Sequence, residues 1–126
     1  MTFKTELQMQ SYCCTWYWNE FRHTDEKQML HANINNSFNR IEGAKNTALG
    51  VVAGVSDTEF IDYGEMWFLE FKLPGGKQSQ DQIDFQRRVE ARGHKYKILY
   101  SFEEFRRFII SRISKRVQDG TLGDNS

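Results

Sequence analysis

The chain has 126 residues, 39% of them hydrophobic and 14% aromatic, which is enough for one folded domain with a single core. Its 17 basic and 17 acidic residues cancel, so net charge gives no sign of a nucleic-acid or membrane partner. Residues 1–20 lack a basic region followed by an apolar run, and no stretch approaches the ~20 apolar residues of a membrane span. A cytoplasmic protein without a membrane partner is expected.

The N-terminal segment predicts a helix. Residues 5–8 (Thr-Glu-Leu-Gln) have the form of a capping box, and the helix is expected to continue to Glu20. The adjacent Cys13 and Cys14 are poorly placed for a disulfide and have no partner ligands at zinc spacing, so we expect them to pack against the core. The side chains available for the core are Leu7, Cys14, Trp18 and Phe21.

The next segment predicts two strands separated by a loop and a short helix. A strand is expected over residues 29–34, and residues 35–40 (Asn-Asn-Ser-Phe-Asn-Arg) indicate a turn-rich loop, because Asn and Ser side chains compete for local backbone hydrogen bonds. A short helix over 44–49 should end at Gly50. A second strand over 58–62 is expected to return through Tyr63 and Gly64, in a tight hairpin, into a third strand.

The third strand carries two charges in an apolar setting. Residues 66–72 (Met-Trp-Phe-Leu-Glu-Phe-Lys) are apolar almost throughout, which predicts a strand buried on both faces. Since alternate side chains of a strand share a face, Glu70 and Lys72 should lie side by side. Five acids and no Lys or Arg occur between Asp57 and Phe71, so a bound divalent metal is one source of the missing positive charge. An ordinary Glu–Lys ion pair is the alternative.

Asp57 and Glu70 are the candidate metal ligands, because Mg²⁺ takes one or two protein carboxylates together with water and phosphate oxygens. Such a metal orients a water molecule and stabilises the charge that develops on a phosphate under attack. Lys72 is a candidate to activate that water or to neutralise the phosphate, since the pKa of a lysine can be tuned. These residues indicate a metal-dependent phosphodiester hydrolase.

The C-terminal half predicts a helix over 80–92 that ends at Gly93, a strand over 96–100, and a long helix capped by Ser101 and Glu104. Residues 118–126 are expected to be a flexible tail, which leaves residues 1–117 as a single domain. Residues 84–116 hold ten Lys or Arg against four Asp or Glu, so this half is expected to meet phosphates; solvated helix faces are the alternative. The apolar stripe expected to face the core in the last helix is Phe102, Phe105, Ile109 and Ile113.

The order of these features resembles the PD-(D/E)XK nuclease superfamily and, within it, the virus-type replication-repair nuclease (VRR-NUC) family. The resemblance spans residues 30–110 and implies an α/β fold with a restriction-endonuclease-like core, in which helices flank both faces of a mixed central sheet of four or five strands. Ser56 stands where many members have proline, which removes one constraint on the turn. The matching features are an Asn-rich segment with Arg40, Gly-Val-Ser-Asp at 54–57, Glu-x-Lys at 70–72, Ser-x-x-Gln at 79–82, Gly93, and Ser-x-Glu-Glu at 101–104.

The resemblance implies a Mg²⁺- or Mn²⁺-dependent DNA endonuclease with Asp57, Glu70, Lys72 and Gln82 as catalytic residues. In similar nucleases an acid on the first helix completes the metal shell, which makes Glu6 a candidate third ligand; a first-turn acid that complements the helix dipole is the alternative. Gln82 also has an alternative role, because a capping box with Ser79 would use its side-chain amide.

Small stand-alone members of the family resemble viral and phage enzymes that act on branched DNA as homodimers, so Holliday-junction resolution is the specific expectation. One alternative is a non-catalytic nucleic-acid or protein-binding module on the same fold, against which the complete set of two acids and a lysine argues. Another is a nuclease that acts on duplex DNA, nicks DNA or cuts RNA. The expected nucleic-acid-binding residues are Asn35, Asn36, Arg40, Lys77, Arg87 and Arg88.

Overall fold

A mixed four-stranded sheet forms the centre of the molecule. The computed structural model describes residues 1–21, 27–33, 50 and 52–118; the expected loop at 35–40, the helix at 44–49 and all but the first residue of the expected tail lie outside these ranges. The strand order is β1-β2-β3-β4, with the first three strands antiparallel and β4 parallel to β3. This architecture confirms the predicted α/β class. The strands are β1 (Gln28–Ala32), β2 (Thr58–Asp62), β3 (Glu65–Phe71) and β4 (Lys95–Leu99).

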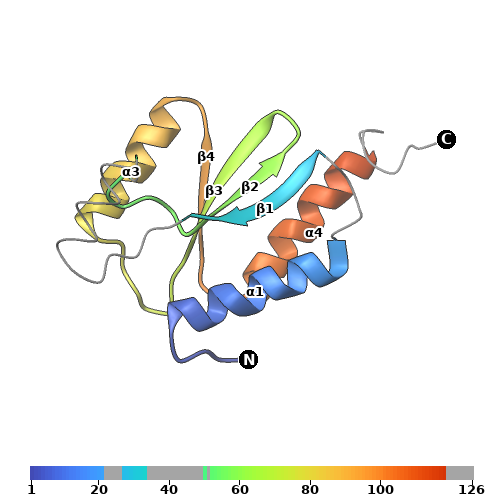
Figure 1. Cartoon of the computed structure of the whole chain (residues 1–126), viewed down its shortest axis with the longest axis horizontal. Helices are drawn as coiled ribbons and strands as arrows, with labels where there is room; N and C mark the ends of the chain where they lie inside the picture. The colour runs from blue at the N-terminus through green and yellow to red at the C-terminus, as the bar shows by residue number, and fades with distance from the viewer. Residues whose placement is uncertain (22–26, 34–49, 51, 119–126) are drawn as a thin grey trace.

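Helices cover both faces of the sheet, as Figure 1 shows: α1 (Glu6–Phe21) and α4 (Phe102–Gln118) lie on one face, and α3 (Gln80–Ala91) lies on the other. The larger core is on the α1 and α4 side and includes Leu69 and Phe71 of β3. A smaller core on the α3 side includes Phe68. Strand β3 is therefore buried on both faces, as its sequence predicts. No helix in the described part of the chain is long and apolar enough to cross a membrane.

The face of α1 that meets the core agrees only in part with the sequence expectation. Met9, Cys13 and Tyr17 are buried. Of the four side chains expected in the core, Cys14 and Phe21 pack against it, whereas Leu7 and Trp18 are 64% and 40% exposed. Apolar side chains occupy most of the circumference of α1, so their spacing did not single out one face. Contact with the sheet and with α4 selects the buried side.

The last helix follows its prediction closely. The Ser101 hydroxyl accepts a hydrogen bond from the backbone N–H of Glu104, and Glu104 Oε1 accepts one from the backbone N–H of Tyr100. These bonds satisfy donors that a helix N-terminus leaves unpaired. Phe105 and Ile109 are fully buried, as the apolar stripe predicts.

A buried ion-pair network joins α4 to the hairpin of β2 and β3. Arg112 Nε donates to Asp62 Oδ2 at 2.6 Å, Arg116 Nε donates to Asp62 Oδ1 at 2.8 Å, and Gln28 Nε2 donates to the same Oδ1 at 2.9 Å. Both guanidinium groups also reach Glu65. Two cations of the basic C-terminal half therefore face the protein's own carboxylates rather than an external phosphate.

Acidification is expected to weaken this network. Burial alone would raise the pKa of Asp62, but hydrogen bonds from Arg116, Gln28 and Arg112 outweigh it and hold the pKa below the usual value of 3.8. Between the folded and the unfolded pKa of Asp62, the unfolded chain binds a proton that the folded chain does not. The stability that Asp62 contributes is therefore fully present above the unfolded pKa and is lost as pH falls through the folded pKa. Urea unfolding between pH 6 and pH 2.5 should show this loss in the wild type and a shallower pH dependence in Asp62→Asn; equal pH dependence in both would contradict it.

Candidate active site

The hairpin of β2 and β3 brings the two candidate metal ligands together. Thr58 pairs with Leu69 in the antiparallel register, so Asp57, which precedes β2, lies opposite Glu70. The backbone N–H of Phe71 donates to Asp57 Oδ2 at 2.7 Å and holds that carboxylate against the end of β3. The separation of the two acids along the sequence is thus the separation that this hairpin requires.

Hydrogen bonds fix the turn that carries Asp57. The buried Ser56 hydroxyl donates to the carbonyl oxygen of Thr58 at 3.1 Å. Asn33, which follows β1, makes two hydrogen bonds to this turn. Its backbone N–H donates to the carbonyl oxygen of Asp57 at 2.9 Å, and its side-chain amide donates to the carbonyl oxygen of Ser56 at 3.1 Å. Ser56 therefore restrains the turn through a hydrogen bond at the position where proline would restrain it through its ring.

Gly54 lets the same turn pack directly against the start of α3. Its φ is +78°, and an added Cβ would lie 2.1 Å from the carbonyl oxygen of Asp81. Gly75 has a similar φ of +83° but nothing within 4 Å of an added Cβ. The close approach explains why glycine is needed at position 54 beyond its backbone conformation.

Gly54→Ala is expected to destabilise the fold by roughly 2–5 kcal/mol, the sum of a left-handed alanine and an overlap with backbone atoms. Gly75→Ala, the matched control, should cost only about 1–2 kcal/mol because it carries the conformational penalty alone. Urea unfolding of both variants measures the difference. Equal destabilisation of the two would show that the contact with Asp81 contributes nothing.

Glu70 and Lys72 are buried neighbours at the end of β3. Their side chains are 1% and 9% exposed, and Lys72 Nζ lies 3.8 Å from Glu70 Oε2. Glu70 Oε1 accepts a hydrogen bond from the hydroxyl of Tyr96 on β4. Glu70 Oε2 receives no hydrogen bond from the described residues. This buried carboxylate oxygen is therefore not committed to a hydrogen bond within the described part of the chain.

The electrostatics of Glu70 favour a bound cation. Burial raises its pKa, and the nearby charge of Asp57 raises it further, while the hydrogen bond from Tyr96 and the charge of Lys72 oppose the shift without cancelling it. A metal ion between two carboxylates would favour their ionised forms and relieve their mutual repulsion. Because Mg²⁺ commonly uses one or two protein carboxylates and keeps several waters, Asp57 and Glu70 fit this kind of ion.

Glu6 on α1 is not brought to the two candidate ligands, whereas Cys14 of the same helix senses Asp57. Burial raises the pKa of the Cys14 thiol to about 11, and the charge of Asp57 adds to the shift. Glu6 lies about eight residues earlier, roughly 12 Å along the helix axis, and is exposed. The described residues form no group of three or more His, Cys, Asp or Glu that could hold a metal. The structure therefore does not bring Glu6 to Asp57 and Glu70.

The side chain of Gln82 is engaged at the N-terminus of α3. Its Oε1 accepts the backbone N–H of Ser79 at 2.8 Å, and its own backbone N–H donates to the Ser79 hydroxyl at 3.2 Å, which completes a capping box. The sequence left two roles open for Gln82, a helix cap and a catalytic residue, and in the structure its side chain forms the helix cap. Its effect on the site is to order the helix start against which Gly54 packs.

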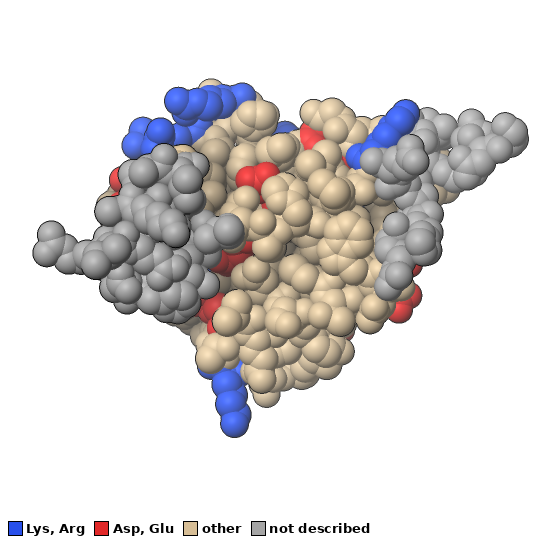
Figure 2. Space-filling view, viewed as in Figure 1, with Lys and Arg blue, Asp and Glu red and all other residues tan. Residues whose placement is uncertain are grey.

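The described basic residues expected to bind nucleic acid are on the surface. Lys77, Arg87 and Arg88 are exposed, and Arg87 makes only a surface pair with Asp84 at 3.6 Å. Figure 2 shows basic groups gathered over the C-terminal end of α3, with acidic groups along the middle of the same face. The remaining three expected residues, Asn35, Asn36 and Arg40, lie outside the described residues.

Two polar residues at the site were not singled out in the sequence. Tyr96 contacts Glu70, and Gln78 Nε2 lies 3.4 Å from the Tyr96 hydroxyl. Tyr96 pairs with Phe68 in the parallel register of β3 and β4, which places it on the Glu70 face of the sheet. In the sequence, Tyr96 stands out as a tyrosine between two lysines of a predicted strand. Its contact with Glu70 could not be predicted from that pattern, because the contact depends on which strand pairs with β4. For Gln78, a loop glutamine, the sequence offers no signal.

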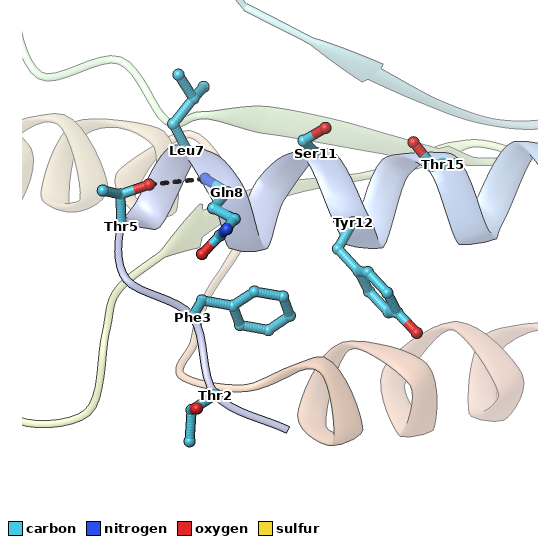
Figure 3. Close-up of a pocket in the computed structure, with 8 residues that line it drawn as sticks. All are labelled: Thr2, Phe3, Thr5, Leu7, Gln8, Ser11, Tyr12 and Thr15. Atoms are coloured by element: carbon cyan, nitrogen blue, oxygen red, sulfur yellow. Dashed lines mark hydrogen bonds between the residues drawn. The ribbon is translucent and has the colours of Figure 1, made fainter.

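A cavity of about 690 Å³ lies elsewhere, along the N-terminal part of α1. Phe3, Leu7 and Tyr12 are among the residues that line it (Figure 3), and none of the lining residues is charged. Neither the two acids nor Lys72 line this cavity. It is therefore separate from the candidate active site.

The fold recurs in solved structures. No protein-family model and no curated protein matches the sequence. A solved structure described as a VRR_NUC domain protein has a TM-score of 0.69 and 18% identity, over 90% of this chain and 92% of the other. A second, described as a VRR_NUC domain, has a TM-score of 0.54 and 19% identity, over 82% of this chain and 92% of the other. The chain therefore has the fold of VRR_NUC domain proteins, in agreement with the order of motifs in its sequence.

Proposed function

We propose that this protein is a divalent-metal-dependent endonuclease that hydrolyses phosphodiester bonds in DNA. The observation that carries the proposal is the buried Glu70 carboxylate, which lies opposite Asp57 and 3.8 Å from the Lys72 ammonium group, with one oxygen that receives no hydrogen bond from the described residues. Burial of a carboxylate oxygen without a hydrogen bond is costly, and a bound cation would offset that cost together with the charge of Lys72. The fold shared with VRR_NUC domain proteins supports the same activity.

The residues have separate roles in this proposal. Asp57, held by the backbone N–H of Phe71, and Glu70 are the protein ligands of Mg²⁺ or Mn²⁺. The bound ion supplies a Lewis acid that orients water and stabilises charge on the phosphate. Lys72 hydrogen-bonds the attacking water or a phosphate oxygen, and its burial beside Glu70 keeps the ammonium group in place. Gln82 is assigned to the helix cap, and Glu6 is left out of the ligand set.

The DNA contacts proposed for the described residues are the exposed side chains of Lys77, Arg87 and Arg88. They are exposed cations on a loop and on α3, which suits contacts with the phosphate backbone. Their loss is expected to weaken binding at all sequences and to reduce its salt dependence. Asn35, Asn36 and Arg40, which lie outside the described residues, are proposed as further DNA contacts.

The proposed substrate is branched DNA, cut by a homodimer. The described part of the chain holds one candidate site, so two symmetric cuts at a four-way junction would use two copies related by a two-fold axis. Sedimentation velocity with and without junction DNA would establish the stoichiometry. A monomer on DNA would retain the nuclease and remove the paired-cut mechanism.

The experiment that tests this proposal compares a labelled four-way junction with linear duplex, flap and single-stranded DNA and with RNA, each in Mg²⁺, in Mn²⁺ and in EDTA. Symmetric paired cuts on the junction, abolished by EDTA, are expected. Equal cutting of junction and duplex would keep the nuclease and discard the branched substrate. Binding without cutting in either metal would favour a non-catalytic binding module.

A further inference from the structure

A chain of hydrogen bonds ends on the buried carboxylate of Glu70. The Tyr96 hydroxyl donates to Glu70 Oε1. Gln78 Nε2 donates to the Tyr96 hydroxyl at 3.4 Å and to Gln86 Oε1 at 3.0 Å, and Gln86 Nε2 donates to Glu90 Oε2 at 3.4 Å. The chain links strand β4, the loop before α3 and α3 itself to one oxygen of the candidate metal site.

The direction of every bond in this chain follows from its two ends. An ionised carboxylate only accepts, so Glu90 fixes the Gln86 amide with its nitrogen outward and its oxygen toward Gln78. The two N–H groups of Gln78 then point to Gln86 and Tyr96. Since a phenol has a single proton and its oxygen already accepts from Gln78, that proton must point to Glu70.

This arrangement leaves the two oxygens of Glu70 unequal. Oε1 is committed to Tyr96, whereas Oε2, on the Lys72 side, receives no hydrogen bond from the described residues. A carboxylate restrained in this way offers a metal one oxygen rather than two. Mg²⁺ and Mn²⁺ accept single-oxygen ligation, while Ca²⁺ takes more oxygens, at longer distances, and often binds a carboxylate through both.

We propose that Tyr96 is a positioning residue that, directed by Gln78, restrains Glu70 to single-oxygen metal ligation and so favours Mn²⁺ and Mg²⁺ over Ca²⁺. The proposal rests on the metal site of the proposed function. The proposal adds Tyr96 and Gln78, which belong to none of the sequence motifs, to the candidate metal site. It also gives that site a source of ion selectivity. Both residues act through Glu70 and need no contact with the ion or with DNA.

The test is calorimetric titration of the metal-free 126-residue protein, without DNA, with Mn²⁺ and separately with Ca²⁺. In Tyr96→Phe, which removes only the hydroxyl, the Mn²⁺ dissociation constant should rise about 10-fold, the usual effect of losing a group that orients a ligand. The Ca²⁺ constant should change less, so that the preference for Mn²⁺ falls. Tyr12→Phe, an exposed tyrosine of α1, is the matched control and should leave both constants unchanged.

A second variant keeps the test decisive if Tyr96→Phe fails to fold. Gln78→Met removes the amide that directs the phenol and should weaken Mn²⁺ binding in the same direction. In the double variant the loss should fall short of the product of the two single losses, because Gln78 donates to the Tyr96 hydroxyl and both side chains act on the same Glu70 carboxylate. The proposal would be overturned if the losses of Mn²⁺ affinity in the two single variants multiplied fully in the double variant. A Mn²⁺ dissociation constant of Tyr96→Phe within twofold of the wild-type value would overturn it as well.

The same titration separates this proposal from the proposed function. A wild type that binds neither ion would overturn both the metal-dependent nuclease and the positioning role. A wild type that binds Mn²⁺ together with a Tyr96→Phe variant of unchanged selectivity would overturn the positioning role alone. Cleavage assays are not needed for either conclusion.

Discussion

Lys72→Met is expected to lower the rate of DNA cleavage by about 10³-fold while leaving Mn²⁺ binding intact. The ammonium group lies 3.8 Å from Glu70 Oε2 at the buried end of β3, and in the proposed function it would contact the attacking water or a phosphate oxygen. Removal of one donor that stabilises developing charge commonly lowers a rate by 10²–10³-fold. Metal affinity should be unchanged or slightly higher, because a positive charge beside the ion has been removed. Single-turnover cleavage and calorimetry on the same preparation measure the two quantities.

Glu70→Gln provides the contrast, since it removes a ligand rather than the lysine. Both Mn²⁺ binding and cleavage should be lost in that variant. Lys4→Met, at an exposed lysine near the N-terminus, is the control for charge removal and should retain the wild-type rate. A Lys72→Met variant that keeps more than a tenth of the wild-type rate would contradict the role assigned to this residue.

Asp62→Ala is expected to destabilise the fold by about 3–5 kcal/mol, because it leaves two buried arginines without their shared acceptor. Asp62 is fully buried, and the Nε atoms of Arg112 and Arg116 lie 2.6 and 2.8 Å from its two oxygens. Glu65 can compensate only in part, since it is more exposed and lies farther from both groups. Urea unfolding at neutral pH gives the change in the free energy of unfolding.

The matched control for Asp62 is Asp84→Ala. Asp84 pairs with Arg87 at 3.6 Å on the surface, where the arginine side chain is 72% exposed. Such pairs contribute about 0–1 kcal/mol, so this variant should unfold close to wild type. If Asp62→Ala costs less than 1 kcal/mol, the network does not fasten α4 to the hairpin.

The sequence predicted the parts of the site that depend on strand periodicity. An apolar run with charges at alternate positions placed Glu70 and Lys72 side by side, and the hairpin through Tyr63 and Gly64 placed Asp57 at the same end of β3. These relations are set by neighbours in the chain. They need no knowledge of how distant elements pack.

Features that depend on distant contacts were not predicted. The approach of Tyr96 to Glu70 requires β4 to pair in parallel with β3, which no local pattern states. The buried face of α1 was predicted only in part, because packing, rather than spacing, selects it. Charge counting assigned Arg112 and Arg116 to a basic half of the chain, whereas both pair with an acid about fifty residues away.

The helix cap at Ser79 and Gln82 is an intermediate case. The Ser-x-x-Gln spacing indicated both a capping box and a motif residue of similar nucleases, and local geometry alone leaves both open. The structure shows the glutamine oxygen bonded to the backbone N–H of Ser79. A short-range pattern can therefore identify the contact, while its part in catalysis requires measurement.

The most direct test of the central claim is a Mn²⁺ titration of DNA cleavage by the wild type and by the Asp57→Asn, Glu70→Gln double variant, with both proteins verified as folded. The account predicts cleavage by the wild type that saturates near the calorimetric Mn²⁺ dissociation constant, and none by the double variant at any Mn²⁺ concentration. Cleavage by the double variant at the wild-type rate would show that Asp57 and Glu70 do not form the catalytic site. A wild type that binds DNA and Mn²⁺ without cutting any substrate would show that the fold serves binding alone.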